Sequence, residues 1–182
     1  MLDLGGGNGM LVRLLRDSGI QAFWEDKYCD NFYARGFEWE RHKDSYPLPS
    51  LATSFEVFEH LANPKQEIMY MLELSPNLLF STELLPTSIP EYSGDKQWWY
   101  YGFSHGQHIS FFTHKSLESI AQEKNLYFCS YKGLHLFSKN KINQTYFMLI
   151  VKFANRGLYF LLHKCLQSKT QEDSKLLEHR NY

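Results

Sequence analysis

A glycine-rich loop near the start of the chain offers the first candidate chemistry. The run LDLGGGNG covers residues 2–9, and it precedes a segment in which Met10, Leu11, Leu14 and Leu15 repeat with helical spacing. Between a strand and a helix, glycines let backbone N–H groups approach a ligand without a Cβ in the way. The pattern therefore predicts a nucleotide-binding loop, with a glycine-rich turn that holds no ligand as the alternative.

The spacing of the glycines distinguishes between classes of nucleotide site. Gly5, Gly7 and Gly9 satisfy G-x-G-x-G, whereas the dinucleotide fingerprint G-x-G-x-x-G would need a glycine in place of Met10. This disfavours a nucleotide-dependent oxidoreductase. Asp26 ends the next apolar run, where a carboxylate can accept hydrogen bonds from both ribose hydroxyls of an adenosine. The preceding residue, Glu25, is the competing candidate for that contact.

Acidic and imidazole side chains form a second candidate constellation. Glu56, Glu59 and His60 follow a predicted strand within five residues, and His108 comes from the end of a long loop. Two carboxylates and two imidazoles can bind a divalent cation, either Mg²⁺ or Mn²⁺ through oxygen or a transition metal through nitrogen. Alternatively, His60 or His108 acts as a catalytic general base for an acceptor hydroxyl. In the third reading, Glu59 and His60 only cap the turn and hydrogen-bond inside the fold.

Aromatic side chains are concentrated in the long loop from Leu84 to Gln107. They are accompanied by imidazoles, in the order Trp98, Trp99, Tyr100, Tyr101, Phe103, His105 and His108. A loop of this length in a compact domain is usually a lid or a binding segment. We expect it at the carboxyl edge of the sheet, where it could form the wall of an acceptor site or simply close the core.

Apolar runs that alternate with helical repeats predict the elements that position these residues. Strands are expected over 1–4, 20–24, 51–55, 78–80, 127–131 and 146–153, with a further strand at 37–39. Helices are expected from Met10, around 31–34, from Pro64, after Thr113, and as an amphipathic helix following 153. The alternation predicts a Rossmann-like, doubly wound α/β fold, with a mostly parallel sheet, helices on both faces and one antiparallel strand near the C-terminus.

Composition limits the class of protein. The 182 residues suit one domain, and 19 Lys and Arg against 20 Asp and Glu argue against nucleic acid as a partner unless a local patch exists. The three cysteines form no CxxC pair, which fits a reducing cytoplasm. The apolar stretch 145–166 contains Lys152, Arg156 and Lys164, so no membrane span is expected. We expect a domain over 1–168 and a polar, frayed tail over 169–182.

Together these motifs resemble a known family. The glycine motif LDLGGGNG, the strand end Trp24-Glu25-Asp26, the block FEVFEHL over 55–61 and the segment GQHISFF over 106–112 resemble class I S-adenosylmethionine-dependent methyltransferases, a bacterial group with an FEVFEHL block. The similarity covers roughly residues 1–125. In that family a helix and the start of the first strand precede the glycine motif, so the resemblance is to a domain incomplete at its N-terminus.

The resemblance implies roles for individual residues. Those expected to contact S-adenosylmethionine are Asp3, Gly5, Gly6, Gly7, Gly9, Asp26, Phe55 and Glu56. A related E-x-x-E-H block with a distant histidine holds a metal in small-RNA 2′-O-methyltransferases. By position, that metal role falls on Glu56, Glu59, His60 and His108.

The expected function is transfer of a methyl group from S-adenosylmethionine to a small-molecule acceptor. By the resemblance the acceptor is sugar-like or a biosynthetic intermediate, and a divalent cation is a possible second cofactor. Two alternatives stay open. One is a metal-assisted RNA 2′-O-methyltransferase, and the other is a catalytically silent domain that keeps the fold as a binding module.

Overall fold

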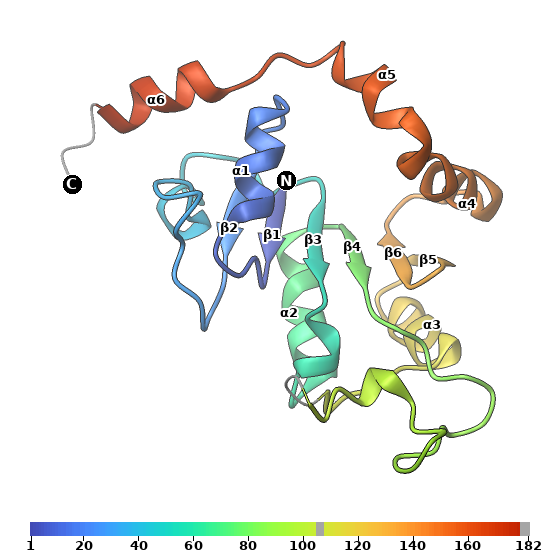
Figure 1. Cartoon of the computed structure of the whole chain (residues 1–182). Helices are drawn as coiled ribbons and strands as arrows, with labels where there is room; N and C mark the ends of the chain where they lie inside the picture. Colours follow the sequence, from blue (N-terminus) through green and yellow to red (C-terminus); the bar gives the residue numbers. More distant parts are fainter. Residues whose placement is uncertain (105–107, 179–182) are drawn as a thin grey trace.

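The computed structural model describes residues 1–104 and 108–178. Within these residues the strands form one sheet in the order β2-β1-β3-β4-β6-β5, as Figure 1 shows. The strands are β1 (Leu2–Leu4), β2 (Phe23–Glu25), β3 (Ala52–Phe55), β4 (Asn77–Ser81), β5 (Tyr127–Tyr131) and β6 (Leu134–Ser138). The helices are α1 (Met10–Asp17), α2 (Pro64–Leu74), α3 (His114–Glu123), α4 (Gln144–Phe153), α5 (Tyr159–His163) and α6 (Thr170–Glu178).

The connections show that the sheet is doubly wound. Strands β2, β1, β3 and β4 are parallel, and β6 runs antiparallel to both β4 and β5. Helix α1 leads to a strand on one side of β1, whereas α2 leads from β3 towards the other side. Because crossovers between parallel strands are right-handed, opposite directions of travel place the two helices on opposite faces. The predicted fold class is confirmed, including one antiparallel strand near the C-terminus.

The core lies where the central strands meet the turn after β3. The rings of Phe58 and Phe80 stack with centroids 4.3 Å apart, and Phe80 also packs on Phe137 of β6. All three side chains are fully buried. Burying an aromatic ring of this size stabilises a fold by roughly 1.5–3 kcal/mol. This packing fixes the turn that carries Glu56, Glu59 and His60.

Two helix starts follow the predicted signals. Pro64 occupies the first turn of α2, where its missing N–H costs no hydrogen bond. Thr113 caps α3: its side chain accepts from the backbone N–H of Ser116, whose hydroxyl in turn accepts from the N–H of Thr113. The proline and the capping box determine where α2 and α3 begin.

The segment expected as a strand over 146–153 is instead helix α4. Asn143 accepts a hydrogen bond from the backbone N–H of Thr145 and so caps the helix, while Phe147 packs inward. The antiparallel strand is β6, which the prediction missed. No helix forms around 31–34, and at 37–39 only an isolated bridge between Trp24 and Glu38 extends the sheet.

The expected frayed tail also differs from the structure over most of its length. Residues 170–178 form α6, and Asp173 makes a two-point ion pair with Arg16 of α1, at 2.6 and 2.7 Å. Arg16 also donates to the carbonyl of Ala22 and lies over the ring of Phe37. Sequence alone did not show that a polar helix would supply the counter-charge for an arginine more than 150 residues away. Residues 179–182 lie outside the described residues.

Candidate cofactor and metal site

The glycine loop passes from β1 into α1 at the carboxyl end of the sheet. The N–H groups of Gly5 and Gly6 donate to the carbonyl of Glu25, which ties the loop to the end of β2. Gly7 has a φ of 53°, a left-handed conformation that favours glycine, and nothing lies within 4 Å of where its Cβ would be. The loop therefore presents bare backbone towards open space, as a ligand loop requires.

A cavity of about 460 Å³ opens beside this loop. Its walls come from the loop, the end of β2, the turn after β3 and one side of α2. The lining residues are Leu4, Gly5, Gly7, Glu25, Asp26, Lys27, Tyr28, Cys29, Glu56, Val57, His60, Leu61, Ala62, Asn63, Glu67, Tyr70 and Met71. The volume lies in the range of small-molecule sites.

The structure brings only some of the predicted residues to this cavity. Gly5, Gly7, Asp26, Glu56 and His60 line it. The other residues predicted for the cofactor, the metal or catalysis are not part of the lining; they are Asp3, Gly6, Gly9, Phe55, Glu59 and His108. Of these, Gly6 packs closely enough that a Cβ would lie 2.8 Å from the Trp24 ring, so its role is to let the loop and β2 approach.

Asp26 shapes the loop as well as lining the cavity. Its Oδ2 accepts from the N–H of Gly7 at 2.9 Å, and its Oδ1 accepts from the N–H groups of Tyr28 and Cys29. A carboxylate offers about four acceptor positions. Three are therefore occupied by backbone donors, which leaves Oδ2 one position for a ligand hydroxyl.

Asp3 stands behind the loop, inside β1. Its Oδ1 accepts from the Thr53 hydroxyl of the neighbouring strand at 2.7 Å. Burial raises the pKa of Asp3 to about 6, against the hydrogen bond from Thr53, which acts in the opposite direction. This carboxyl group links β1 to β3 and does not reach the cavity surface.

Helix α2 contributes cavity residues that the sequence analysis did not identify. Glu67, Tyr70 and Met71 face the cavity at helical spacing, and the Tyr70 hydroxyl donates to Glu25 at 3.0 Å. Burial, together with the nearby Glu25 charge, raises the pKa of Tyr70 to about 12, and burial also raises the pKa of Glu25. The available signal was the i, i+3, i+4 pattern of the helix, which core packing would also produce.

Glu59, His60 and His108 meet beside the cavity. One ligand atom from each lies within 4.8 Å of the others, and the two imidazole rings have centroids 4.8 Å apart. Glu59 is fully buried, and its two carboxylate oxygens have no hydrogen-bond partner among the described residues. Desolvation raises the pKa of Glu59 to about 7, and the charge of Glu56 adds to the rise. An unpartnered buried carboxylate next to two imidazoles is a donor set that fits a divalent cation.

A further hydrogen bond orients His108 in the cluster of Glu59, His60 and His108. The carbonyl oxygen of Tyr100 lies 2.6 Å from Nδ1 of His108, and since a carbonyl only accepts, Nδ1 carries a proton and Nε2 is the nitrogen that could bind a cation. Glu56, predicted as a fourth ligand, is not part of the cluster. Its carboxylate instead accepts from the Ser81 hydroxyl at 2.6 Å, and its backbone has a left-handed φ of 54°.

The aromatic residues of the long loop mostly pack on one another. Trp98, Tyr101, Phe103 and Phe111 form ring contacts, while Tyr100 is buried with its hydroxyl 3.1 Å from that of Thr82. No described residue of this loop lines the cavity. Packing into a local core, rather than forming the wall of the cavity, therefore explains most of these aromatic side chains. The predicted contribution of His105, with Gly106 and Gln107 of the GQHISFF segment, falls outside the described residues.

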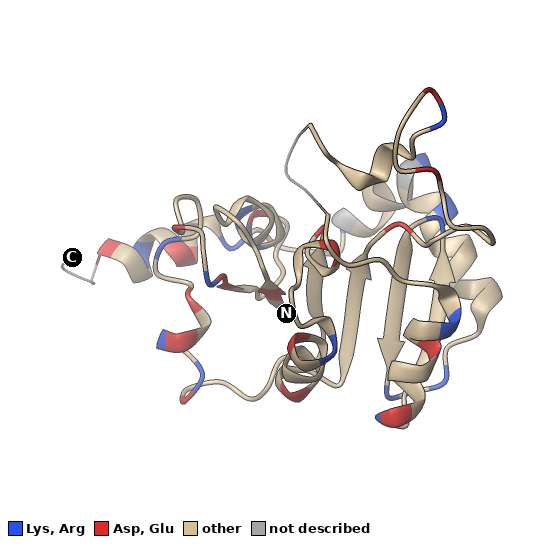
Figure 2. Ribbon diagram, turned by 90° about the horizontal axis from the view of Figure 1, so that it is seen from below, with Lys and Arg blue, Asp and Glu red and all other residues tan. Residues whose placement is uncertain are grey.

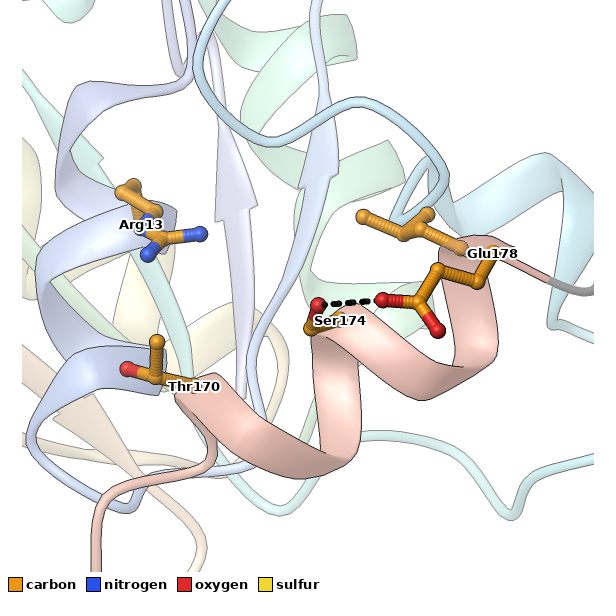
Figure 3. Close-up of a pocket in the computed structure, with 5 residues that line it drawn as sticks. Arg13, Thr170, Ser174 and Glu178 are labelled. Atoms are coloured by element: carbon orange, nitrogen blue, oxygen red, sulfur yellow. Dashed lines mark hydrogen bonds between the residues drawn. The ribbon is translucent and has the colours of Figure 1, made fainter.

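A second hollow lies between α1 and α6, and Figure 3 shows its lining. Arg13 comes from α1, whereas Thr170, Ser174 and Glu178 come from α6, with the Ser174 hydroxyl donating to Glu178. No residue predicted for the cofactor, the metal or catalysis lines it. The candidate chemistry is thus confined to the carboxyl end of the sheet.

Comparison with known proteins gives a family. The family described as a methyltransferase domain matches residues 1–130, whereas no curated protein matches the chain. Among solved structures, WbdD in a co-crystal with the kinase inhibitor LY294002 is similar, with 10% sequence identity and a TM-score of 0.42. That alignment covers 78% of this chain and 36% of the WbdD chain, so this chain spans little more than a third of it. Since the family match covers more than half of its length, the protein belongs to the methyltransferase domain family.

Proposed function

We propose that the cavity binds S-adenosylmethionine and that the domain transfers the methyl group of this cofactor to a small-molecule acceptor. The observation that carries the proposal is the cavity beside Gly5 and Gly7, which combines bare loop backbone with the Asp26 carboxylate at the end of β2. In open α/β sheets, ligands bind at the carboxyl ends of the strands, near the point where the strand order reverses. Here that point is between β1 and β3.

Different residues of the cavity would contact different parts of such a cofactor. Gly7, which has open space where a Cβ would lie, leaves room for the methionine chain of the cofactor, and the remaining acceptor position on Asp26 suits one ribose hydroxyl. Glu25, which lines the same cavity and accepts from Tyr70, is our candidate for the other hydroxyl. Bound S-adenosylmethionine would supply a sulfonium methyl group: an acceptor atom bonds to the methyl carbon as the carbon–sulfur bond breaks, and S-adenosylhomocysteine is the leaving group. The protein then contributes mainly alignment and exclusion of water.

His60 is the side chain best placed to serve the acceptor. It lines the cavity, and a neutral imidazole can take the proton of an acceptor hydroxyl as the methyl group moves. We keep a sugar-like small molecule or biosynthetic intermediate as the acceptor class. The cavity is lined by four carboxylates, Glu25, Asp26, Glu56 and Glu67, against the single cation of Lys27, and this acidic balance argues against a nucleic acid in this role.

Isothermal titration with S-adenosylhomocysteine tests the proposal. We expect micromolar binding that Asp26→Ala weakens by about tenfold or more. Asp30→Ala is the matched control, because it removes an exposed carboxylate from the same loop that does not line the cavity. As Asp26 also supports the loop, Ala62→Trp provides a second variant that fills the cavity without touching Asp26. No binding by the folded wild-type protein would favour the silent binding module instead.

A second candidate is a metal-assisted methyltransferase, including the RNA 2′-O-methylating kind. The observation that favours it is the buried, unpartnered carboxylate of Glu59 beside His60 and His108. A divalent cation held by these residues would polarise an acceptor hydroxyl as a Lewis acid. While His60 binds a cation through its lone pair it cannot also act as the base, so the two candidates assign it different roles.

Calorimetric titration with Mn²⁺ distinguishes His60 as a metal ligand from His60 as a base. If the cluster binds the ion, Glu59→Gln should weaken binding by about tenfold or more, because it keeps the shape of the side chain and removes its charge. His114→Gln, outside the cluster, serves as the control. Equal affinity in all three proteins would eliminate the metal candidate and leave His60 as the base.

A further inference from the structure

The outer face of α4 is apolar and uncovered in this structure. Tyr146, Leu149, Ile150 and Phe153 are exposed at positions i, i+3, i+4 and i+7, so they form one stripe along the helix. The opposite face carries the buried Phe147, and the Gln144 side chain at the start of the helix hydrogen-bonds to the backbone of Ser130 in β5. The exposed stripe is therefore the side that faces away from the sheet.

Helix α5, which follows α4 after a kink at Arg156 and Gly157, also carries exposed apolar side chains. Phe160 and Leu161 are 72% and 70% exposed, and Tyr159 and Leu162 are more than half exposed. A soluble monomer rarely exposes a contiguous group of large apolar side chains, and where it does the patch usually marks an interaction site. We call the exposed apolar side chains of α4 and α5, together with the basic residues among them, the α4–α5 surface.

The charge pattern indicates what covers the α4–α5 surface. From residue 124 to residue 171 the chain contains eight Lys and Arg and no Asp or Glu. Figure 2 shows the Lys and Arg residues and the Asp and Glu residues of the ribbon in different colours. Lys152, Arg156 and Lys164 are exposed, and they alternate with the apolar residues of α4 and α5 along the sequence. None of the ion pairs between described residues includes any of these three. The nearly neutral total for the whole chain hides this local positive charge.

We propose that the α4–α5 surface lies in the interface of an anionic lipid bilayer. Apolar and aromatic side chains that alternate with Lys and Arg are the pattern of helices that bury one face at the headgroup boundary. The long basic side chains reach the phosphates while their stems stay beside the apolar residues. Among the described residues no helix is long and apolar enough to cross a bilayer, so the contact is with one leaflet.

Two other occupants fit this surface less well. In a symmetric dimer through this face, Lys152, Arg156 and Lys164 of both copies would approach one another with no carboxylate between them. A nucleic acid would satisfy the charges, but Ile150, Phe160 and Leu161 would gain nothing from a phosphate backbone. Only a surface that is anionic and apolar at once matches both features.

The α4–α5 surface is separate from the candidate cofactor cavity. In Figure 1, α4 and α5 lie at the upper right, above β5 and β6. The glycine loop after β1 and the start of α2 lie towards the lower ends of the strand arrows. No residue of α4 or α5 lines the cavity. Binding to a membrane and binding of a cofactor should therefore be separable by mutation.

Co-sedimentation of the full chain with vesicles tests the proposal. We expect binding to vesicles of phosphatidylcholine mixed with phosphatidylserine, weaker binding at high salt, and little binding to phosphatidylcholine alone. The double variant Phe160→Ser/Leu161→Ser and the triple variant Lys152→Glu/Arg156→Glu/Lys164→Glu should each lose about tenfold or more in affinity. The control Lys96→Glu/Lys115→Glu, which reverses charges of exposed lysines elsewhere, should bind as the wild type does.

A spectroscopic readout shows insertion directly. None of the four tryptophans of the chain lies in α4 or α5, so Phe160→Trp adds a reporter whose emission should shift to shorter wavelength with anionic vesicles. Absence of binding to anionic vesicles would overturn the proposal. So would a concentration-dependent dimer in sedimentation equilibrium that Phe160→Ser/Leu161→Ser abolishes, or binding to a single-stranded oligonucleotide with no binding to vesicles.

Discussion

At the scale of single residues, buried carboxyl groups set much of the character of the site. Asp3 and Glu59 both lie inside the protein, and burial raises the pKa of each. They differ in their partners: Asp3 accepts from Thr53, whereas Glu59 accepts from no described residue. Asp3 therefore joins two strands at the expense of some stability, while the unpartnered Glu59 is the residue that a cation would stabilise.

The raised pKa of Asp3 makes stability depend on pH in a defined direction. Its pKa is about 6 in the folded protein against 3.8 ordinarily, so the folded state holds the proton more tightly. The contribution of this group to stability falls as pH rises from about 4 to above 6, by roughly 3 kcal/mol in total. Asp3→Asn removes that loss and keeps an acceptor for Thr53.

Urea unfolding across this pH range is the measurement. Asp3→Asn should be more stable than the wild type at pH 7.5 and similar to it near pH 4, whereas the exposed control Asp44→Asn should show no such divergence. A constant difference between Asp3→Asn and the wild type across the range would contradict a raised pKa in the folded state.

At the scale of elements, the contact between α1 and α6 joins the beginning of the described chain to its end. Arg16 is 2% exposed and has three partners: the Asp173 carboxylate, the Ala22 carbonyl and the Phe37 ring. Such an arrangement satisfies a buried cation at several points. It also fixes α1, whose first residue follows directly on the glycine loop.

Removing one partner of this ion pair should cost far more than removing both. Asp173→Leu leaves Arg16 buried without its counter-charge and should lower the free energy of unfolding by about 3 kcal/mol or more. Arg16→Met combined with Asp173→Leu should cost much less, since no buried charge is left. Urea unfolding of the two single variants and the double variant gives the coupling energy.

The comparison for this experiment is an ion pair at the start of α6, formed with Lys169, which directly precedes the helix. Glu172 bonds to Lys169 and is mostly exposed, so Glu172→Ala should change stability by less than about 1 kcal/mol. Additive costs for Arg16 and Asp173 would show that the two side chains do not depend on each other.

At the scale of the whole molecule, the C-terminal segment returns across the structure. From β6 the chain passes through α4 and α5 at one end of the sheet and reaches α6 beside α1 at the other, an arc that Figure 1 shows clearly. All cavity residues and the cluster of Glu59, His60 and His108 nevertheless belong to residues 1–168. We therefore propose 1–168 as the functional domain, with α6 as a support.

Truncation separates these two roles. A chain that ends at Ser168 loses α6, exposes Arg16 and the surface that Leu177 covers, and should unfold at a lower temperature. Below that temperature it should still bind S-adenosylhomocysteine with an affinity within a few-fold of the full chain. A chain ending at Glu178 keeps α6 and is the control. Loss of binding by the folded shorter chain would place α6 within the functional domain.

Short-range patterns in the sequence predicted much of the fold. Pro64 and Thr113 marked helix starts because their effects are local: a missing N–H in one case and a capping hydroxyl in the other. The FEVFEHL block brought Glu59 and His60 together because both follow the same strand. The fold class and the family assignment followed from such local signals and from the glycine loop.

Tertiary packing decided what local pattern left open. The run over 146–153 is apolar and rich in residues that favour strands, but the sheet was completed by β6, which Lys132 and Gly133 join to β5 in a tight turn with positive φ at both residues. In β6, His135 interrupted the apolar pattern, yet both of its ring nitrogens find partners once the strand is paired, at Ser130 and at the carbonyl of Thr82.

The same distinction between local pattern and tertiary packing applies to the candidate site and to the α4–α5 surface. The sequence by itself determined the glycine loop, the carboxylate after β2 and the chemistry available after β3, because each depends on neighbours within a few residues. Only the tertiary structure brought the predicted His108 beside Glu59 and His60 without Glu56, gave Arg16 its partner and left the α4–α5 surface uncovered. Those outcomes depend on which distant groups satisfy a buried charge or cover an apolar face, and that is fixed only when the whole chain packs.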